Sequence, residues 1–99
     1  MQYDQGWNPK VAVSGQYALE VHSAGNTLGS LWYHLGYLGT ENVDMGLSHQ
    51  YNRGSNPSVA IDRQYGTAVE VHEGDPGALW YHSALFNYVR DLPVLRPVP

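Results

Sequence analysis

Residues Tyr3–Val13 read YDQGWNPKVAV, and the pattern returns at Tyr51–Ile61 as YNRGSNPSVAI. Two further blocks recur in the same order: ALEVH at 18–22 with AVEVH at 68–72, and LWYH at 31–34 with LWYH at 79–82. The spacing is 48 residues for the first and third blocks and 50 for the second. A period of this size is typical of solenoids, propellers and arrays, whose single units cannot bury their own apolar surface. We therefore divide the chain into repeat one, residues 1–50, and repeat two, residues 51–99.

The composition favours an all-β protein that is rich in turns. Only 14% of the 99 residues are charged, and eleven Gly and six Pro supply turn residues. Eight Tyr and three Trp stand against a single Phe. Tyr and Trp have apolar bodies and polar tips, which suit half-buried surfaces and ligand contacts. The absence of cysteine excludes disulfides and thiolate metal ligands.

The charge pattern argues against two classes of partner. The formal net charge is −4, and the five basic residues form no cluster, so we expect no nucleic-acid binding. No apolar run has the length of a membrane span, so we expect no membrane partner. Polar residues follow Met1 directly, so we also expect no signal peptide. The residues leave the cellular compartment open.

Turn signals divide repeat one into four short expected strands. Gly, Asn and Pro residues separate apolar stretches at Lys10–Ser14, Tyr17–His22, Leu31–Leu35 and Val43–Tyr51. Four strands in a unit of about 45 residues are typical of a propeller blade. The tail, residues 87–99, contains three prolines, so we expect no regular inner strand there. Five interpretations of this tail stay open: a replaced fourth strand, a linker, an end cap, a fragment boundary or an engineered segment.

Alternation along the expected strands places polar and aromatic side chains on one face. If the second and third strands of each repeat pair as a hairpin, these faces adjoin. The residues concerned are Glu20, His22, Trp32 and His34 in repeat one, and Glu70, His72, Trp80 and His82 in repeat two.

The repeated motifs resemble those of tandem-repeat β-propeller lectins and related bacterial proteins. Three elements carry the resemblance: Asn-Pro-x-Val-Ala, Val-Glu-Val-His, and Leu-Trp-Tyr-x-x-Gly. They stand at Asn8–Ala12, Leu19–His22 and Leu31–Gly36, and again at Asn56–Ala60, Val69–His72 and Leu79–Ala84. The resemblance covers nearly all of repeat one and repeat two up to about Phe86. It implies blade-like repeats and a carbohydrate ligand.

Two blades cannot close a propeller, which needs at least about four. We therefore expect homo-oligomerisation, with a six-bladed trimer favoured over a dimer or a tetramer. Gln2 and Tyr3 match Gln50 and Tyr51, so the first residues are expected to complete a neighbouring blade, in the same chain or another. The other interpretation is that the chain is a piece of a longer array.

The eight polar and aromatic residues allow three interpretations. Their recurrence favours a hydrogen-bonded structural network over ligand contact. Ligand contact is in turn favoured over a His/His/Glu metal site, because the usual metal-ligand spacings are absent. We therefore expect no metal and no cofactor.

The expected activity is non-catalytic glycan binding, with Trp stacking on the sugar and Glu and His bonding its hydroxyls. The alternative is a repeat fragment, or an engineered self-assembling propeller, without ligand-binding activity. An enzyme is not expected, because the serines lack a nucleophile elbow and nothing distinguishes Glu20 from Glu70 as acid and base. The loops Ser23–Gly29 and Glu73–Gly77, which differ between the repeats, and Trp7, which is Ser55 in repeat two, are secondary candidates for binding.

Overall fold

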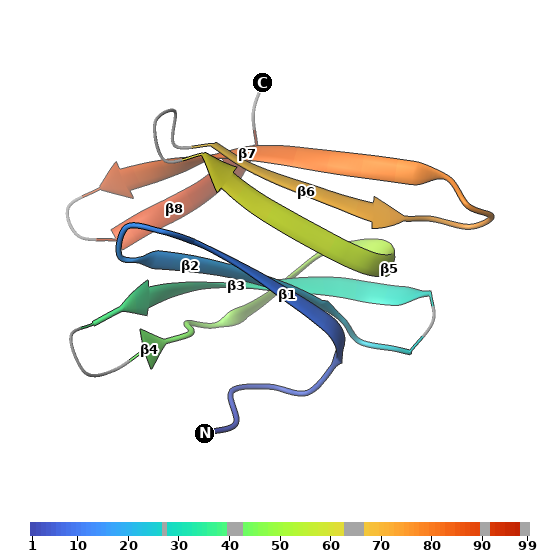
Figure 1. Cartoon of the computed structure of the whole chain (residues 1–99), viewed down its shortest axis with the longest axis horizontal. Helices are drawn as coiled ribbons and strands as arrows, with labels where there is room; N and C mark the ends of the chain where they lie inside the picture. Colours follow the sequence, from blue (N-terminus) through green and yellow to red (C-terminus); the bar gives the residue numbers. More distant parts are fainter. Residues whose placement is uncertain (27, 40–42, 63–66, 90–91, 98–99) are drawn as a thin grey trace.

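Eight β-strands form one curled antiparallel sheet in the computed structural model (Figure 1). The structure describes residues 1–26, 28–39, 43–62, 67–89 and 92–97. The strands are β1 (Trp7–Ser14), β2 (Tyr17–Ser23), β3 (Gly29–Leu38), β4 (Val43–Asp44), β5 (Ser48–Asp62), β6 (Thr67–Glu73), β7 (Leu79–Val89) and β8 (Leu92–Pro97). These strands confirm the predicted all-β class. No helix among the described residues is long and apolar enough to span a membrane.

The two repeats fold with the same local register. In repeat one, β2 pairs with β3 so that Glu20 lies opposite His34 and His22 opposite Trp32. In repeat two, β6 pairs with β7 so that Glu70 lies opposite His82 and His72 opposite Trp80. The hairpin expected from the sequence is therefore confirmed in both repeats, and it brings the polar residues of each pair to the same side of the sheet.

Each Asn-Pro pair lies in a β-bulge within a strand, where the sequence analysis placed a turn before the strand. The register shifts between Trp7 and Lys10 in repeat one, and between Ser55 and Ser58 in repeat two. Asn8 and Asn56 adopt φ values of 53° and 49°. Among residues with a side chain, Asn tolerates this left-handed region well. The first strand therefore begins at Trp7 and passes through the bulge.

The longest strand, β5, belongs to both repeats. Its first half, from Ser48 to Gly54, pairs with β3, and its second half, from Ser55 to Asp62, pairs with β6. In Figure 1 it runs from the group of β2 and β3 to the group of β6 and β7. The expected single strand Val43–Tyr51 was therefore wrong in its boundaries. It is divided into β4 and the start of β5 by a turn at Gly46, whose φ is 68°.

The proline-containing tail forms β8, which pairs with β7 from Ala84 to Val89. It lies at the end of the strand order. Prolines are tolerated on such an edge strand because a missing N–H there interrupts no inner ladder. Of the interpretations left open for the tail, a replaced fourth strand and an end cap both fit this edge strand. The two pairings differ in position. In repeat one, β5 pairs with residues 29–34 of β3, which correspond to residues 77–82, whereas β8 pairs with residues 84–89 of β7.

The core lies between the two repeats. Leu19 of β2 and Ala68 of β6 are buried against each other, and partly buried apolar side chains surround them. These neighbours are Tyr33 and Leu35 from repeat one, and Val59 and Ile61 from repeat two. Repeat two therefore covers the apolar face of repeat one, which leaves the opposite, polar face of the β2–β3 hairpin for the site described next.

Candidate functional site

The polar face of repeat one is covered by the N-terminal segment, residues 1–6. The hydroxyl of Tyr3 donates a hydrogen bond to Oε2 of Glu20 at 2.5 Å. Glu20 in turn lies 3.0 Å from Nδ1 of His22 through its Oε1 atom. Both Glu20 and His22 are buried. The buried carboxylate therefore has two partners and holds the imidazole in a fixed orientation.

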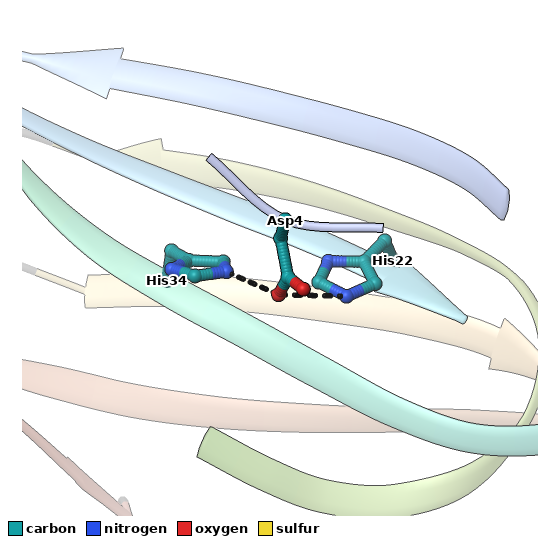
Figure 2. A group of neighbouring side chains, drawn as sticks. All are labelled: Asp4, His22 and His34. Atoms are coloured by element: carbon teal, nitrogen blue, oxygen red, sulfur yellow. Dashed lines mark hydrogen bonds and ion pairs between the residues drawn. The ribbon is translucent and has the colours of Figure 1, made fainter. Parts of the chain in front are cut away.

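Asp4 lies between the rings of His22 and His34 (Figure 2). Its Oδ2 atom is 2.8 Å from Nε2 of His34 and 3.5 Å from Nε2 of His22. The two rings stack with centroids 5.7 Å apart. The backbone N–H of Gln5 donates to the other oxygen, Oδ1, at 2.7 Å. The bonds from His34 and from the Gln5 amide hold the pKa of Asp4 below its ordinary value.

The outer ring nitrogens of both histidines face acceptors. Nδ1 of His34 is 3.2 Å from the carbonyl oxygen of Gly46, and Nδ1 of His22 faces the Glu20 carboxylate. Both Nδ1 atoms therefore have an acceptor on the outer side, and both Nε2 atoms face the carboxylate of Asp4.

Repeat two reproduces this arrangement with one chemical change. Tyr51 donates to Glu70, Glu70 contacts Nδ1 of His72 at 3.0 Å, and the rings of His72 and His82 stack 5.6 Å apart. At the position of Asp4 stands Asn52, whose Nδ2 atom is 2.6 Å from Nε2 of His82. An amide therefore donates to the histidine in repeat two where a carboxylate oxygen faces it in repeat one.

The orientation of the Asn52 amide is fixed by its second contact. The backbone N–H of Arg53 donates to Oδ1 of Asn52 at 2.7 Å, as the N–H of Gln5 does to Oδ1 of Asp4. With the oxygen occupied, the NH₂ group is the one that points to His82. The two repeats thus hold the same backbone geometry around different side-chain atoms.

The close approach of the backbone to the histidine explains a recurring glycine. A Cβ atom on Gly6 would lie 2.5 Å from Cδ2 of His22, and one on Gly54 would lie 2.5 Å from Cδ2 of His72. Real Cβ atoms do not approach other atoms so closely, so only glycine lets the chain pass over the ring. This accounts for the Gly in both copies of the first block.

A hollow of about 260 Å³ opens beside this network in repeat one. It is lined by Asp4, Gln5, His22, Ala24, Trp32 and Ser48. Trp32 is half-buried there. The hollow therefore combines one aromatic side chain with a carboxylate, a carboxamide and a hydroxyl.

The eight residues singled out from the sequence divide into two environments. Five of them are buried: Glu20, His22 and His34 in repeat one, and Glu70 and His72 in repeat two. Glu20 bonds to His22 and Glu70 to His72, as the structural interpretation expects, whereas His34 bonds to Asp4 and to the Gly46 carbonyl. Trp32 lines the hollow, whereas Trp80 and His82 are exposed.

Sequence reasoning missed the residues that complete each network, namely Tyr3 and Asp4 in repeat one and Tyr51 and Asn52 in repeat two. They lie 17 to 30 positions from their partners. Their recurrence at equivalent positions of the first block was the available signal.

Two groups of side chains place potential metal-ligand atoms within 4.8 Å of one another. One is Asp4, His22 and His34, and the other is Glu70, His72 and His82. The His/His/Glu set that the sequence analysis ranked below the other two interpretations has its ligand atoms together in repeat two, while in repeat one Asp4 stands in the place of Glu20. Comparison of the chain with protein-family models, curated proteins and solved structures finds no match.

Proposed function

We propose that this chain is a non-catalytic carbohydrate-binding module that acts as a ring of several copies. The observation that carries the binding proposal is the hollow beside Trp32. A sugar offers an apolar ring face and a rim of hydroxyls, so its sites combine an aromatic surface with a few well-placed polar groups. Trp32 supplies the surface, and Asp4, Gln5 and Ser48 supply the polar groups.

The buried residues have a supporting role in this proposal. Glu20 holds His22, and His34 together with the Gln5 amide holds Asp4. The side chain that faces a hydroxyl is then Asp4, whose carboxylate accepts strong hydrogen bonds. The exposed Trp80 of repeat two is a second stacking surface, without a carboxylate at the equivalent of Asp4.

Assembly is supported by a difference between equivalent apolar faces. Leu19 is 3% exposed and Leu31 0%, but their equivalents in repeat two, Val69 and Leu79, are 42% and 81% exposed. Val71 and Tyr81 on the same face are exposed as well. A contiguous apolar face of this kind is typical of an interaction surface.

The matching surface lies on repeat one. Val59 and Ile61 of repeat two pack on repeat one, while their equivalents Val11 and Val13 are 59% and 57% exposed. Within the chain, Val59 and Ile61 pack on the apolar face of repeat one. A second copy can place its Val11 and Val13 on the exposed apolar face of repeat two in the same way. This head-to-tail contact uses different surfaces on its two sides, and such a contact gives a ring where the rotation between copies closes and an open filament where it does not.

A free strand edge supports the same contact. In repeat one, β3 pairs with β5 from Gly29 to His34. Among the described pairings, the equivalent part of β7 pairs only with β6, because β8 joins it from Ala84 onward. Such an edge is a template for another strand.

The N-terminal segment of a neighbouring copy fits this edge. Residues 2–6 read QYDQG, and residues 50–54, which pair with β3, read QYNRG. Asn52 pairs with repeat one through its backbone, and Tyr51 lies beside it at the register shift, while the side chains of both hold repeat two. In the same way, the backbone of residues 2–6 can join the β7 edge of a neighbouring copy while the side chains of Tyr3 and Asp4 keep their contacts to repeat one. Assembly therefore leaves the site of repeat one intact. The proposed ring is a trimer of six repeats, with a dimer and a tetramer as the other closed forms.

Native mass spectrometry tests the assembly part. The expected result is a discrete trimer that Leu79→Asp converts to monomer and that Leu47→Asp leaves intact. Leu47 is a matched control, because it is 78% exposed but lies between β4 and β5 and belongs to neither of the two apolar surfaces named above. A folded wild-type monomer at all concentrations would reject the ring.

A glycan array with the assembled protein tests the binding part. We expect a sugar signal that Trp32→Ala abolishes and Trp7→Ala, at an exposed tryptophan outside the hollow, leaves unchanged. An assembled protein that binds no glycan would leave self-assembly as the whole activity.

A further inference from the structure

The site of repeat one directs both histidines at a single carboxylate oxygen. Nδ1 of His22 and Nδ1 of His34 face acceptors on the outer side, Glu20 and the Gly46 carbonyl. Their inner Nε2 atoms face the same atom, Oδ2 of Asp4, at 3.5 and 2.8 Å. Two imidazole nitrogens and a carboxylate oxygen, all potential metal ligands, thus lie within 4.8 Å of one another.

Repeat two fills the equivalent place with an amide. There the NH₂ group of Asn52 lies 2.6 Å from Nε2 of His82. The side chains of Asp4 and Asn52 differ by one heavy atom, and of the two only Asp4 offers a carboxylate oxygen as a metal ligand at this place.

We propose that Asp4, His22 and His34 bind one divalent transition-metal ion per chain, with Zn²⁺ the preferred ion. Two imidazole nitrogens and a carboxylate oxygen are ligands that Zn²⁺ accepts. In tetrahedral zinc sites with bonds of about 2.0–2.1 Å, neighbouring ligand atoms lie about 3.3 Å apart. The contacts of 2.8 and 3.5 Å from Oδ2 of Asp4 to the two Nε2 atoms bracket that value.

The groups behind the ligands fit the same assignment. Metal-bound histidines usually donate their other N–H to a carboxylate or a backbone carbonyl, which fixes the ring and makes it a better ligand. His22 has the carboxylate of Glu20 and His34 has the carbonyl of Gly46. Tyr3 bonds to Glu20 and extends this support outward.

Two protein histidines and one carboxylate leave a fourth position for the ion. Asp4 and His22 also line the hollow beside Trp32, so a water molecule or a ligand oxygen reaches that position from the hollow. All three protein ligands come from one repeat, so the metal site requires neither glycan binding nor ring assembly.

The test titrates the tag-free chain, residues 1–99, with ZnCl₂ by calorimetry and with CoCl₂ by visible absorption. We expect one ion per chain, and for Co²⁺ the intense bands of a tetrahedral complex. Asp4→Asn, which gives repeat one the amide of repeat two, should weaken binding by more than about 100-fold, since even outer residues of metal sites contribute 10–100-fold. Asp75→Asn, at an exposed carboxylate of the repeat-two loop, should bind as wild type does.

A matched histidine pair locates the ion. His34→Gln should abolish binding, and His82→Gln should leave it unchanged. Loss with His82→Gln and retention with His34→Gln would assign the ion to Glu70, His72 and His82 and overturn the proposal. Absence of binding to the folded wild type would overturn it too, and would mean that a proton on a histidine balances Asp4. Circular dichroism of each variant separates lost binding from lost folding.

Discussion

Oδ2 of Asp4 lies 2.8 Å from Nε2 of His34, in the position where repeat two places the amide nitrogen of an asparagine against His82. The backbone contact of the next residue is 2.7 Å long in both repeats. Repeat one therefore presents a carboxylate to its histidines and repeat two an amide, on the same scaffold. The two units of this chain are equivalent in fold but different in chemistry.

The approach of Gly6 to His22 predicts a local stability effect. Gly6→Ala would place its Cβ 2.5 Å from the ring and 2.9 Å from the carbonyl oxygen of Ser23. We expect a loss of about 1–3 kcal/mol in the free energy of unfolding, because the ring or the backbone has to shift. Urea denaturation measures it. Gly25→Ala is the control, because its Cβ would meet nothing within 4 Å, and an equal loss there would contradict the explanation.

The tyrosine–glutamate bonds predict unequal effects in the two repeats. Tyr51→Phe removes the donor to the buried carboxylate of Glu70 and should lower the free energy of unfolding by about 1–3 kcal/mol, the cost of a buried acceptor that loses its partner. Tyr3→Phe should cost less than about 1 kcal/mol, because Tyr3 is exposed and water can replace it. Equal losses in urea denaturation would show that burial does not set the difference.

Tyr51 also predicts a loss of stability at alkaline pH. Burial and the hydrogen bond to Glu70 raise the pKa of Tyr51 above its ordinary value of 10.0. The folded state keeps the phenol proton where the unfolded state releases it, so this contribution is complete below about pH 10 and is lost progressively above it. Urea midpoints at pH 8, 10 and 11 should fall more steeply for wild type than for Tyr51→Phe. Parallel curves would exclude this linkage.

The head-to-tail contact predicts complementation between two assembly-deficient variants. Leu79→Asp spoils the face of repeat two but keeps Val11 and Val13, whereas Val13→Asp spoils the opposite surface. Each variant alone should be monomeric, and an equimolar mixture should form a one-to-one heterodimer, because one intact pair of surfaces remains. Native mass spectrometry of differently labelled chains shows the mass. A mixture that stays monomeric would contradict a contact made of two different surfaces.

Metal addition predicts a stability gain that is separate from assembly. Zn²⁺ at about 100 times its dissociation constant should add about 2.7 kcal/mol to the free energy of unfolding, since it binds the folded state. EDTA should reverse the gain without changing the oligomeric mass, because the three ligands belong to one repeat. A gain of the same size in Asp4→Asn would place the stabilising ion elsewhere.

Much of the local structure could be predicted from the repeated blocks. The alternation in ALEVH and LWYH predicted the strand faces, and the pairing of β2 with β3 confirms that the polar faces adjoin, whereas the register that opposes Glu20 to His34 came from the structure. The contacts of Tyr3 and Asp4 could not be predicted, because they depend on where the chain passes after the bulge at Asn8. The continuous β5 was missed for a related reason. An Asn-Pro pair usually marks a turn or the start of a strand, but here a bulge at Asn56 lets one strand continue through it.

The sequence by itself determined the two units, their all-β character and the partition of each hairpin into a polar and an apolar face, because side chains alternate along any strand. Only the tertiary structure decided which of the equal faces is covered. Tyr33 packs on the core between the repeats, and Tyr81, in an identical LWYH block, is 73% exposed. Burial depends on what another segment places over a surface, and in the described chain repeat two lies over repeat one.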